Sequence, residues 1–170
     1  NLILIEKGIN YEIILINDAS PDNNSTWLKI KKIINNNPNI IGINLQFNVG
    51  QFQSLLIGFK YSKGDYVITM DDDLQHPPEE IPKLINKTIE MPNIDVVIGK
   101  YSKKNHPVLR NLGRILVNFI YNNVYNKPKN LSTTSFRIIK RTLINNLLLF
   151  KTVKPVLGSL ILQLTNKIVN

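Results

Sequence analysis

The sequence predicts an α/β fold: a mostly parallel sheet with helices on both faces. Short runs of almost continuous apolar residues alternate with amphipathic segments of helical length. Strands in a parallel sheet have this composition because helices cover both of its sides. The length of 170 residues suits one domain with its own core. We therefore expect a single domain over residues 1–170.

The first hundred residues contain four predicted strands separated by helices. The strands are expected at 11–17, 39–45, 65–70 and 94–99, and the helices at 25–35, at 50–62 and from Pro77 or Pro78 onward. Ser25 is expected to cap the first helix, and proline suits the first turn of the third. Residues 1–8 look like the end of a helix with no strand before it. We therefore expect a fragment of a longer protein that lacks the first strand of its sheet.

The pattern changes after Gly99. Residues 100–106 are polar and loop-like, 109–125 are amphipathic, 132–139 are β-like, and 154–170 are expected to be helical. The segment 109–125 is expected to be a core-packed helix. Its basic residues are also compatible with contact to an anionic membrane surface.

Charge is divided unevenly along the chain. The net charge is +9, yet all twelve acidic residues lie between Glu6 and Asp95, where eight lysines leave a net charge of −4. From Val96 onward there are thirteen lysines and arginines and no carboxylate side chain. The first part is therefore suited to hold a cation, and the second to meet an anion.

The composition disfavours several classes of protein. No apolar run approaches the roughly 18 residues needed to cross a bilayer, and the first residues lack the features of a signal peptide. The absence of cysteine excludes disulfides, thiolate catalysis and cysteine zinc sites. No basic run is interleaved with aromatic residues, so no nucleic-acid partner is expected.

Two carboxylate loops follow predicted strands, at the edge where open parallel sheets bind ligands. Asp18 follows the first strand, and Asp71, Asp72 and Asp73 follow the third. Adjacent carboxylates repel one another, and their hard oxygens suit Mg²⁺ or Mn²⁺ bound together with substrate phosphates. The alternative is that these aspartates only form a turn and cap the next helix.

Four segments occur in the order and spacing of one known family. They are Ile16-Asn-Asp-Ala-Ser-Pro-Asp22, Asn48-Val-Gly-Gln51, Asp71-Asp-Asp-Leu-Gln-His-Pro-Pro-Glu79 and Ser135-Phe-Arg137. Together they resemble family 2 glycosyltransferases of the GT-A (Rossmann-like) fold, especially the branch of dolichol-phosphate mannose synthase and bacterial polyprenyl-phosphate glycosyltransferases. The sequence departs from the family at Asn17, where Asp is usual.

The resemblance implies a nucleotide-sugar and metal site within residues 1–99. It implies contacts to the nucleotide sugar from Asp18, Asn48, Gly50, Asp71 and Asp73, and ligation of Mg²⁺ or Mn²⁺ by Asp71, Asp73 and Gln75. Asp71 and Asp73 are thus the candidate catalytic residues. Asp72 stands at a variable position and is given no role. Residues 100–170 are expected to form the acceptor side.

The acceptor is predicted from what the second half of the sequence lacks. Transfer to a sugar hydroxyl generally needs a carboxylate base, but no acidic residue follows Asp95, which leaves His106 as a candidate. A phosphate acceptor is already ionised and needs cations instead. The resemblance offers candidates for holding that phosphate: Lys100, Arg110, Arg114, Ser135 and Arg137.

We therefore predict inverting transfer from a UDP- or GDP-linked sugar to a polyprenyl phosphate, at the cytoplasmic face of the membrane, in cell-envelope glycan or glycolipid synthesis. Two alternatives stay open: extension of a surface polysaccharide at a sugar hydroxyl, and a non-catalytic nucleotide- or lipid-binding domain. A nucleotidyltransferase is a weaker alternative, because the sequence shows no Gly-rich, basic phosphate loop near its start. The sequence does not specify the sugar, the base, the metal or the oligomeric state.

Overall fold

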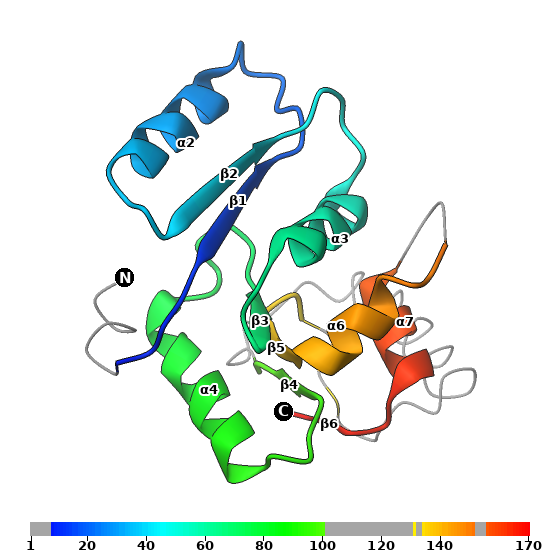
Figure 1. The fold of residues 1–170 in the computed structure, drawn as a ribbon. Coiled ribbons are helices and arrows are strands. Elements are labelled where there is room, and N and C mark those ends of the chain that lie inside the picture. Colours follow the sequence, from blue (N-terminus) through cyan, green and yellow to red (C-terminus); the bar gives the residue numbers. More distant parts are fainter. Residues whose placement is uncertain (1–7, 101–130, 132–133, 152–155) are drawn as a thin grey trace, which may run out of the picture. The chain divides into compact units, whose positions relative to one another are not determined.

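The computed structural model describes residues 8–100, 131, 134–151 and 156–170, which form two compact units (Figure 1). The first unit takes the described residues up to Asp65 together with Lys151, and the second takes those of Tyr66–Phe150 and Val156–Asn170. Each unit has its own sheet. The predicted division of roles between residues 1–99 and 100–170 concerns ligands and stays a prediction.

The first unit is built on a parallel pair of strands. β1 (Ile13–Asn17) pairs with β2 (Ile40–Asn44), and α2 (Ser25–Asn35) connects them. Parallel neighbours need such a crossover, because the chain must return to the same end of the sheet before the second strand begins. α3 (Gln51–Tyr61) follows β2. These four elements confirm the prediction to within two residues at each end.

The two helices of this unit lie on opposite faces of the strand pair (Figure 1). Gly42 of β2 lies against α2, where an added Cβ would come within 2.4 Å of the Ile34 side chain. Gly58 of α3 packs on the other face, where a Cβ would lie 2.9 Å from the Ile16 side chain of β1. The missing side chains at these two glycines therefore allow each helix to pack closely on the strands.

α2 begins with a carboxylate cap from the preceding loop. Asp22 Oδ2 accepts hydrogen bonds from the Thr26 hydroxyl at 2.5 Å, the Thr26 amide at 2.9 Å and the Ser25 hydroxyl at 3.0 Å. The bond from the Thr26 hydroxyl contributes most to lowering the pKa of Asp22 below its ordinary value. The expectation that Ser25 caps this helix is wrong, because Ser25 is its first residue and donates to Asp22.

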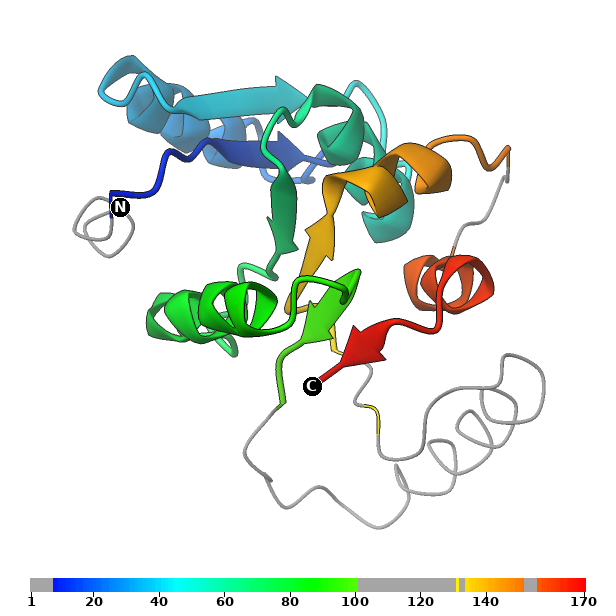
Figure 2. The ribbon, with the colours of Figure 1, turned by 60° about the horizontal axis from the view of Figure 1, so that its bottom comes forward.

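The second unit contains a mixed sheet. Its strands are β3 (Tyr66–Thr69), β4 (Val96–Ile98), β5 (Arg137–Lys140) and β6 (Ile168–Val169), which lie side by side in the order β3, β5, β4, β6 (Figure 2). β5 runs antiparallel to both of its neighbours, whereas β6 is parallel to β4. The expectation of a mostly parallel sheet therefore needs correction at β5, although it holds for β1 with β2 and for β4 with β6.

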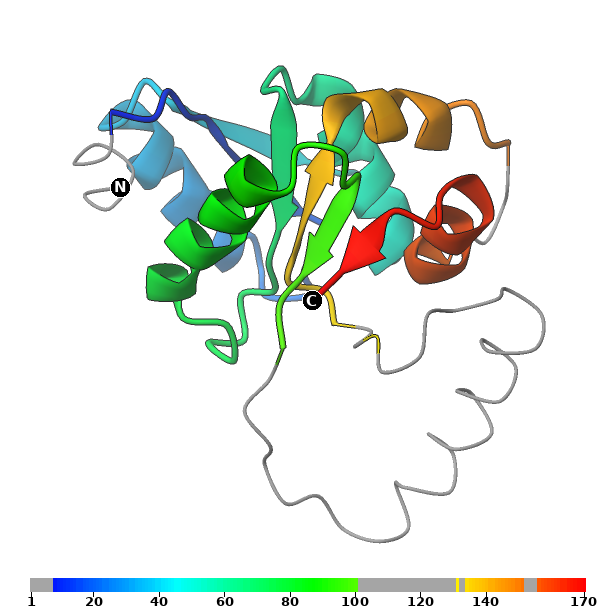
Figure 3. The same ribbon diagram turned by 90° about the horizontal axis from the view of Figure 1, so that it is seen from below.

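Helices cover both faces of this sheet, as predicted (Figures 1 and 3). On one face, α4 (Ile81–Glu90), which follows the 3-10 turn η1 (Pro78–Glu80), packs Leu84 in a cluster with Val97 and Ile138. On the other face, α6 (Arg141–Leu147) contacts β3, β5 and α7 (Leu157–Leu164). Successive strand residues point to opposite faces. Ile139 therefore points away from α4, and it is fully buried.

The later elements differ more from the prediction. α6 was not expected, and the tail that was expected to be helical over 154–170 forms α7 to Leu164 and then β6. The expected helix 109–125, residues 1–7, and residues 132–133 of the expected strand 132–139 lie outside the described residues. Among the helices that are described, none is both long enough and apolar enough to cross a bilayer.

Candidate functional site

In the second unit, the strand ends form the edge at which the sequence predicted a ligand site. Arg137, the first residue of β5, lies opposite both Thr69, the last residue of β3, and Ile98, the last residue of β4. Because β5 is antiparallel to these strands, its start lies beside their carboxyl ends. Asp71 and Lys100 each follow two residues after those ends. The aspartate loop, the loop before β5 and Lys100 therefore share one edge of the sheet.

Asp71 contacts the loop that precedes β5. The Ser135 hydroxyl donates a hydrogen bond to Asp71 Oδ2, and the Ser135 carbonyl accepts one from the Thr69 hydroxyl. Thr69 is buried and Asp71 is half-buried. The first aspartate of the loop is thus tied to a residue 64 positions away in the sequence.

The residues after Asp71 are presented to solvent. Asp72, Asp73 and Gln75 are exposed, and Leu74 keeps 93% of its surface accessible. Asp73 Oδ1 accepts a hydrogen bond from the Gln75 amide at 3.0 Å, and Leu74 between them has a left-handed φ of 60°. Aspartate commonly forms such turns by bonding the backbone two residues onward. The turn keeps the Asp73 carboxylate close to the backbone of Gln75.

The chemistry of this loop fits a divalent metal that shares its coordination with phosphates. Across the described parts of the chain, no three His, Cys, Asp or Glu side chains gather into a ready-made metal site. Mg²⁺ commonly takes only one or two protein carboxylates and completes its shell with substrate phosphates and water. Asp71, Asp73 and the Gln75 amide oxygen are hard oxygen donors of this kind, so they could hold Mg²⁺ or Mn²⁺ together with a diphosphate.

In the first unit, the structure brings Asp18, Asn48 and Gly50 together. Asp18 Oδ1 accepts the Val49 amide and Asp18 Oδ2 accepts the Gly50 amide, each at 2.8 Å. The Asn48 side chain donates to the Asp18 carbonyl at 3.0 Å. Gly50 precedes α3 and has φ 86° and ψ 154°, a backbone conformation that is essentially limited to glycine. The Asp18 carboxylate therefore anchors the start of α3, where the positive end of the helix dipole favours it.

Asn17, for which the sequence predicted no role, takes part in a hydrogen-bond network at the ends of β1 and β2. Its side chain is 5% exposed. Its Nδ2 donates to Asn44 Oδ1 at 2.8 Å, and its Oδ1 accepts the Ser20 amide at 3.2 Å. In the observed arrangement Asn17 both donates and accepts, whereas an ionised Asp could only accept. Asn17 and Asn44 end adjoining strands, and this is the signal that could have indicated their contact.

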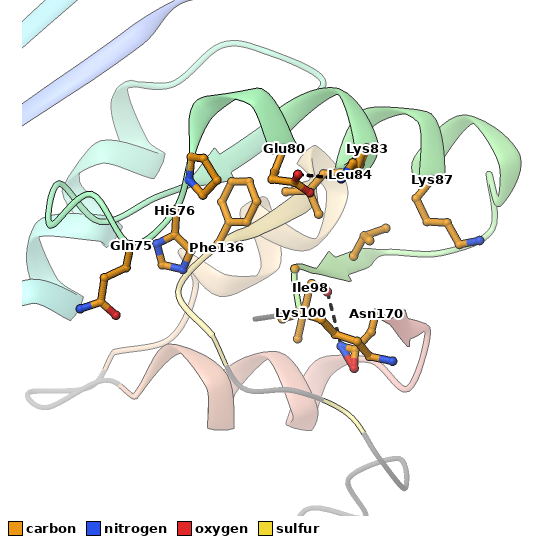
Figure 4. Close-up of a pocket in the computed structure, with 13 residues that line it drawn as sticks. Gln75, His76, Glu80, Lys83, Leu84, Lys87, Ile98, Lys100, Phe136 and Asn170 are labelled. Carbon is orange, nitrogen blue, oxygen red and sulfur yellow. Dashed lines mark hydrogen bonds and ion pairs between the residues drawn. The ribbon is translucent and has the colours of Figure 1, made fainter. Parts of the chain in front are cut away.

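Lys100, a predicted acceptor residue, lies at a cavity of about 610 Å³ in the second unit. Figure 4 shows this cavity, with Gln75 and His76 at one side and Lys100 beside Asn170 at another. His76 is buried, with its ring centroid 5.1 Å from that of Phe136. Lys83 and Lys87 also line the cavity, and each is paired with a glutamate on α4 or the preceding turn. The cavity therefore combines an apolar wall with cationic side chains.

The other predicted acceptor residues differ in their placement. Arg137 is 8% exposed, within β5, and Ser135 contacts Asp71. Arg110, Arg114 and the alternative base His106 lie outside the described residues. Their roles stay predictions.

Residues 3–148 match the family described as glycosyl transferase family 2. The match covers most of the chain, and the chain belongs to this family. The resemblance stated from the four sequence segments, including the GT-A type of α/β fold, is thereby confirmed.

Solved structures with a similar fold include two of TarS 1–349 from S. aureus. The first has a TM-score of 0.58 and 17% identity, and the second, in complex with UDP, has 0.59 and 16%. In both cases the matched region covers 94% of this chain and 48% of TarS 1–349. The mannosyltransferase PcManGT from Pyrobaculum calidifontis, in complex with GDP-Man and Mn²⁺, has a TM-score of 0.55 and 16% identity and covers 80% of this chain and 37% of that one. At these identities the likeness concerns the fold, and this chain spans less than half the length of these structures.

Proposed function

We propose that the protein to which this chain belongs is an inverting glycosyltransferase that uses a UDP- or GDP-linked sugar and Mg²⁺ or Mn²⁺. The observation that carries this proposal is the loop Asp71 to Gln75, which presents exposed carboxylates at the carboxyl end of β3. Family membership gives the loop its context. TarS bound to UDP and PcManGT bound to GDP-Man and Mn²⁺ identify suitable test ligands.

In this proposal, Asp71, Asp73 and Gln75 hold the metal and the diphosphate. The metal, when bound, neutralises negative charge that develops on the departing nucleoside diphosphate. The residues of the chain supply the orientation. Asp71 is fixed against Ser135, and the turn at Asp73 keeps its carboxylate near Gln75. In the first unit, Asp18 and the start of α3 are proposed to contact the nucleotide.

We propose a polyprenyl phosphate as the acceptor. A phosphate oxygen is already ionised and needs no base to attack the sugar, and no carboxylate side chain follows Asp95. Lys100 supports this choice because it is exposed on the same edge of the sheet as Asp71. Arg110, Arg114 and Arg137 are the further proposed cations, since arginine binds phosphate through two parallel hydrogen bonds.

A lipid acceptor requires that the protein act at a membrane surface. A lipid phosphate lies in the membrane, and we propose that the protein acts at its cytoplasmic face in cell-envelope glycan or glycolipid synthesis. The thirteen basic residues after Asp95 support this, because each lysine or arginine near an anionic surface adds about 1 kcal/mol of attraction.

The acceptor is tested with the full-length protein, labelled UDP- and GDP-sugars, and either polyprenyl phosphate in detergent or an oligosaccharide. We expect labelled lipid, and we expect Lys100→Gln to raise the KM for the lipid phosphate by about tenfold, as lost contact with a charged group implies. Lys151→Gln, at another exposed lysine, is the matched control and should leave KM unchanged. Label transferred to the oligosaccharide alone would refute the phosphate acceptor while leaving the donor site standing.

A further inference from the structure

Ser135 makes hydrogen bonds both to the last residue of β3 and to Asp71, which follows that strand. Its hydroxyl donates to Asp71 Oδ2, and its carbonyl accepts from the hydroxyl of Thr69. Thr69 is the last residue of β3 and is 5% exposed. The end of β3 therefore holds Ser135, and Ser135 in turn contacts the loop that follows β3.

We propose that Ser135 is a positioning residue that fixes the Asp71 carboxylate for the metal and diphosphate. This inference rests on the proposed function of the Asp71 loop. A carboxylate in a loop can rotate about its side-chain bonds, and a hydrogen bond to one oxygen restricts that rotation. Asp71 Oδ2 accepts the Ser135 hydroxyl, and this bond restricts the orientation of the whole carboxylate. Groups that hold a metal-binding carboxylate in this way commonly change metal affinity 10- to 100-fold when they are removed.

The hydrogen-bond chemistry of serine favours this role over direct contact with an acceptor phosphate. A hydroxyl has one proton to donate, and that of Ser135 is directed at Asp71. An ionised phosphate accepts hydrogen bonds and would compete for the same proton. The acceptor role that the family resemblance implied for Ser135 is therefore replaced, in this proposal, by a role on the donor side.

The loop that carries Ser135 has attachments that do not involve Asp71. The Phe136 carbonyl accepts the Gly99 amide at 2.9 Å, and the Thr134 hydroxyl donates to the Gly99 carbonyl at 2.9 Å. These bonds tie the loop to the end of β4. Removing the Ser135 hydroxyl is therefore expected to remove one restraint on the Asp71 carboxylate while the loop keeps its place.

The test measures Mn²⁺ affinity directly in the full-length protein, from the electron paramagnetic resonance signal of free Mn²⁺ with saturating UDP or GDP. We expect Ser135→Ala to weaken Mn²⁺ binding about tenfold and Ser135→Thr, which keeps the hydroxyl, to restore most of it. Thr88→Val removes a hydroxyl that donates to the Ile85 carbonyl of its own helix, α4, and should bind Mn²⁺ as the wild type does.

A double-mutant cycle separates positioning from general damage. If Ser135 acts through Asp71, Ser135→Ala should have little further effect in an Asp71→Asn background. An equal tenfold loss in both backgrounds would overturn the proposal. Wild-type Mn²⁺ affinity in folded Ser135→Ala would overturn it as well, and would leave the proposed function intact.

A second variant covers the case in which Ser135→Ala does not fold. Thr69→Val removes the hydroxyl that holds the Ser135 carbonyl, so we expect weaker Mn²⁺ binding, in the same direction and smaller. Unchanged affinity in folded Thr69→Val would count against the proposal. A wild-type protein that binds neither UDP nor GDP with Mn²⁺ would overturn the proposed function and this inference together.

Discussion

The two carboxylate loops of the chain are held in different ways. In the first unit, both oxygens of Asp18 accept backbone amides at the start of α3. In the second unit, Asp71 accepts a side-chain hydroxyl from a distant loop, and Asp72 and Asp73 are exposed. Backbone anchoring makes Asp18 part of the fold, whereas the exposed aspartates contribute little to folding. Substitutions in the first loop should therefore affect stability, and those in the second should affect ligand binding.

The largest effect is expected at Asp73. In the full-length protein, Asp73→Ala should lower sugar transfer by about 100-fold or more, because a metal stabilises the transition state by several kcal/mol. The midpoint of thermal unfolding should stay unchanged, since the side chain is exposed. The measurement is transfer of label from a UDP- or GDP-sugar. Asp72→Ala is the matched control and should retain activity within about threefold. Equal losses in the two variants would remove the distinction between these aspartates.

Asp18 should show the opposite behaviour in stability. Asp18→Ala leaves the Val49 and Gly50 amides without their observed acceptor, and each unsatisfied group costs about 1 to 3 kcal/mol when buried. With both groups partly exposed, we expect a loss of about 2 to 3 kcal/mol in the free energy of unfolding, measured by urea denaturation. Asp65→Ala, at an exposed aspartate of the same unit, should change it by less than about 0.5 kcal/mol. An unchanged free energy of unfolding in Asp18→Ala would show that the loop does not depend on the Asp18 carboxylate.

Gly50 tests the backbone side of the same anchor. Any side chain at φ 86° and ψ 154° is strained, and we expect Gly50→Ala to cost about 1 to 2 kcal/mol in unfolding free energy. A Cβ there would meet no atom within 4 Å, so a clash would not explain the loss. Urea denaturation measures it, and full stability in Gly50→Ala would contradict the backbone conformation of this loop.

The smallest effect is expected at Asp22 and depends on pH. Its pKa is lowered in the folded protein, chiefly by the hydrogen bond from the Thr26 hydroxyl. Its contribution to stability is therefore fully present above the ordinary aspartate pKa of about 3.9 and is lost as the pH falls through the lowered pKa. We expect Asp22→Ala to destabilise the protein at pH 7 and to differ less from the wild type near pH 3, as measured by denaturant unfolding. A difference that is the same at both pH values would assign the effect to packing and not to charge.

The sequence predicted the first four strands and three helices because the strands are short apolar runs, the helices are amphipathic segments, and turn residues separate them. α6 gave no such signal, because it follows β5 without a turn, lacks a side-chain cap and contains Asn145 and Asn146. β6 is two residues long and depends on pairing with β4, which local sequence does not encode. Thr165 ends the preceding helix and donates to Asp95 at 2.6 Å, another contact that depends on tertiary structure.

The same limit applies to the site. The positions of the carboxylates after β1 and β3 could be predicted, because each follows an apolar run of strand length in the sequence. The contact between Ser135 and Asp71 could not be predicted, because it depends on β5 running antiparallel between β3 and β4. A parallel β5 would have placed its last residue, Lys140, at that edge in place of its first, Arg137. The direction of one strand therefore decides which loop meets the aspartates.

The central claim is that the loop from Asp71 to Gln75 binds a nucleoside diphosphate through a divalent metal. Calorimetric titration of the full-length protein with UDP and GDP, with Mn²⁺ and again with excess chelator, tests it most directly. We predict binding with Mn²⁺ that disappears with the chelator and weakens by at least about tenfold in Asp73→Ala. Binding that is equally strong without metal and in Asp73→Ala would contradict the claim.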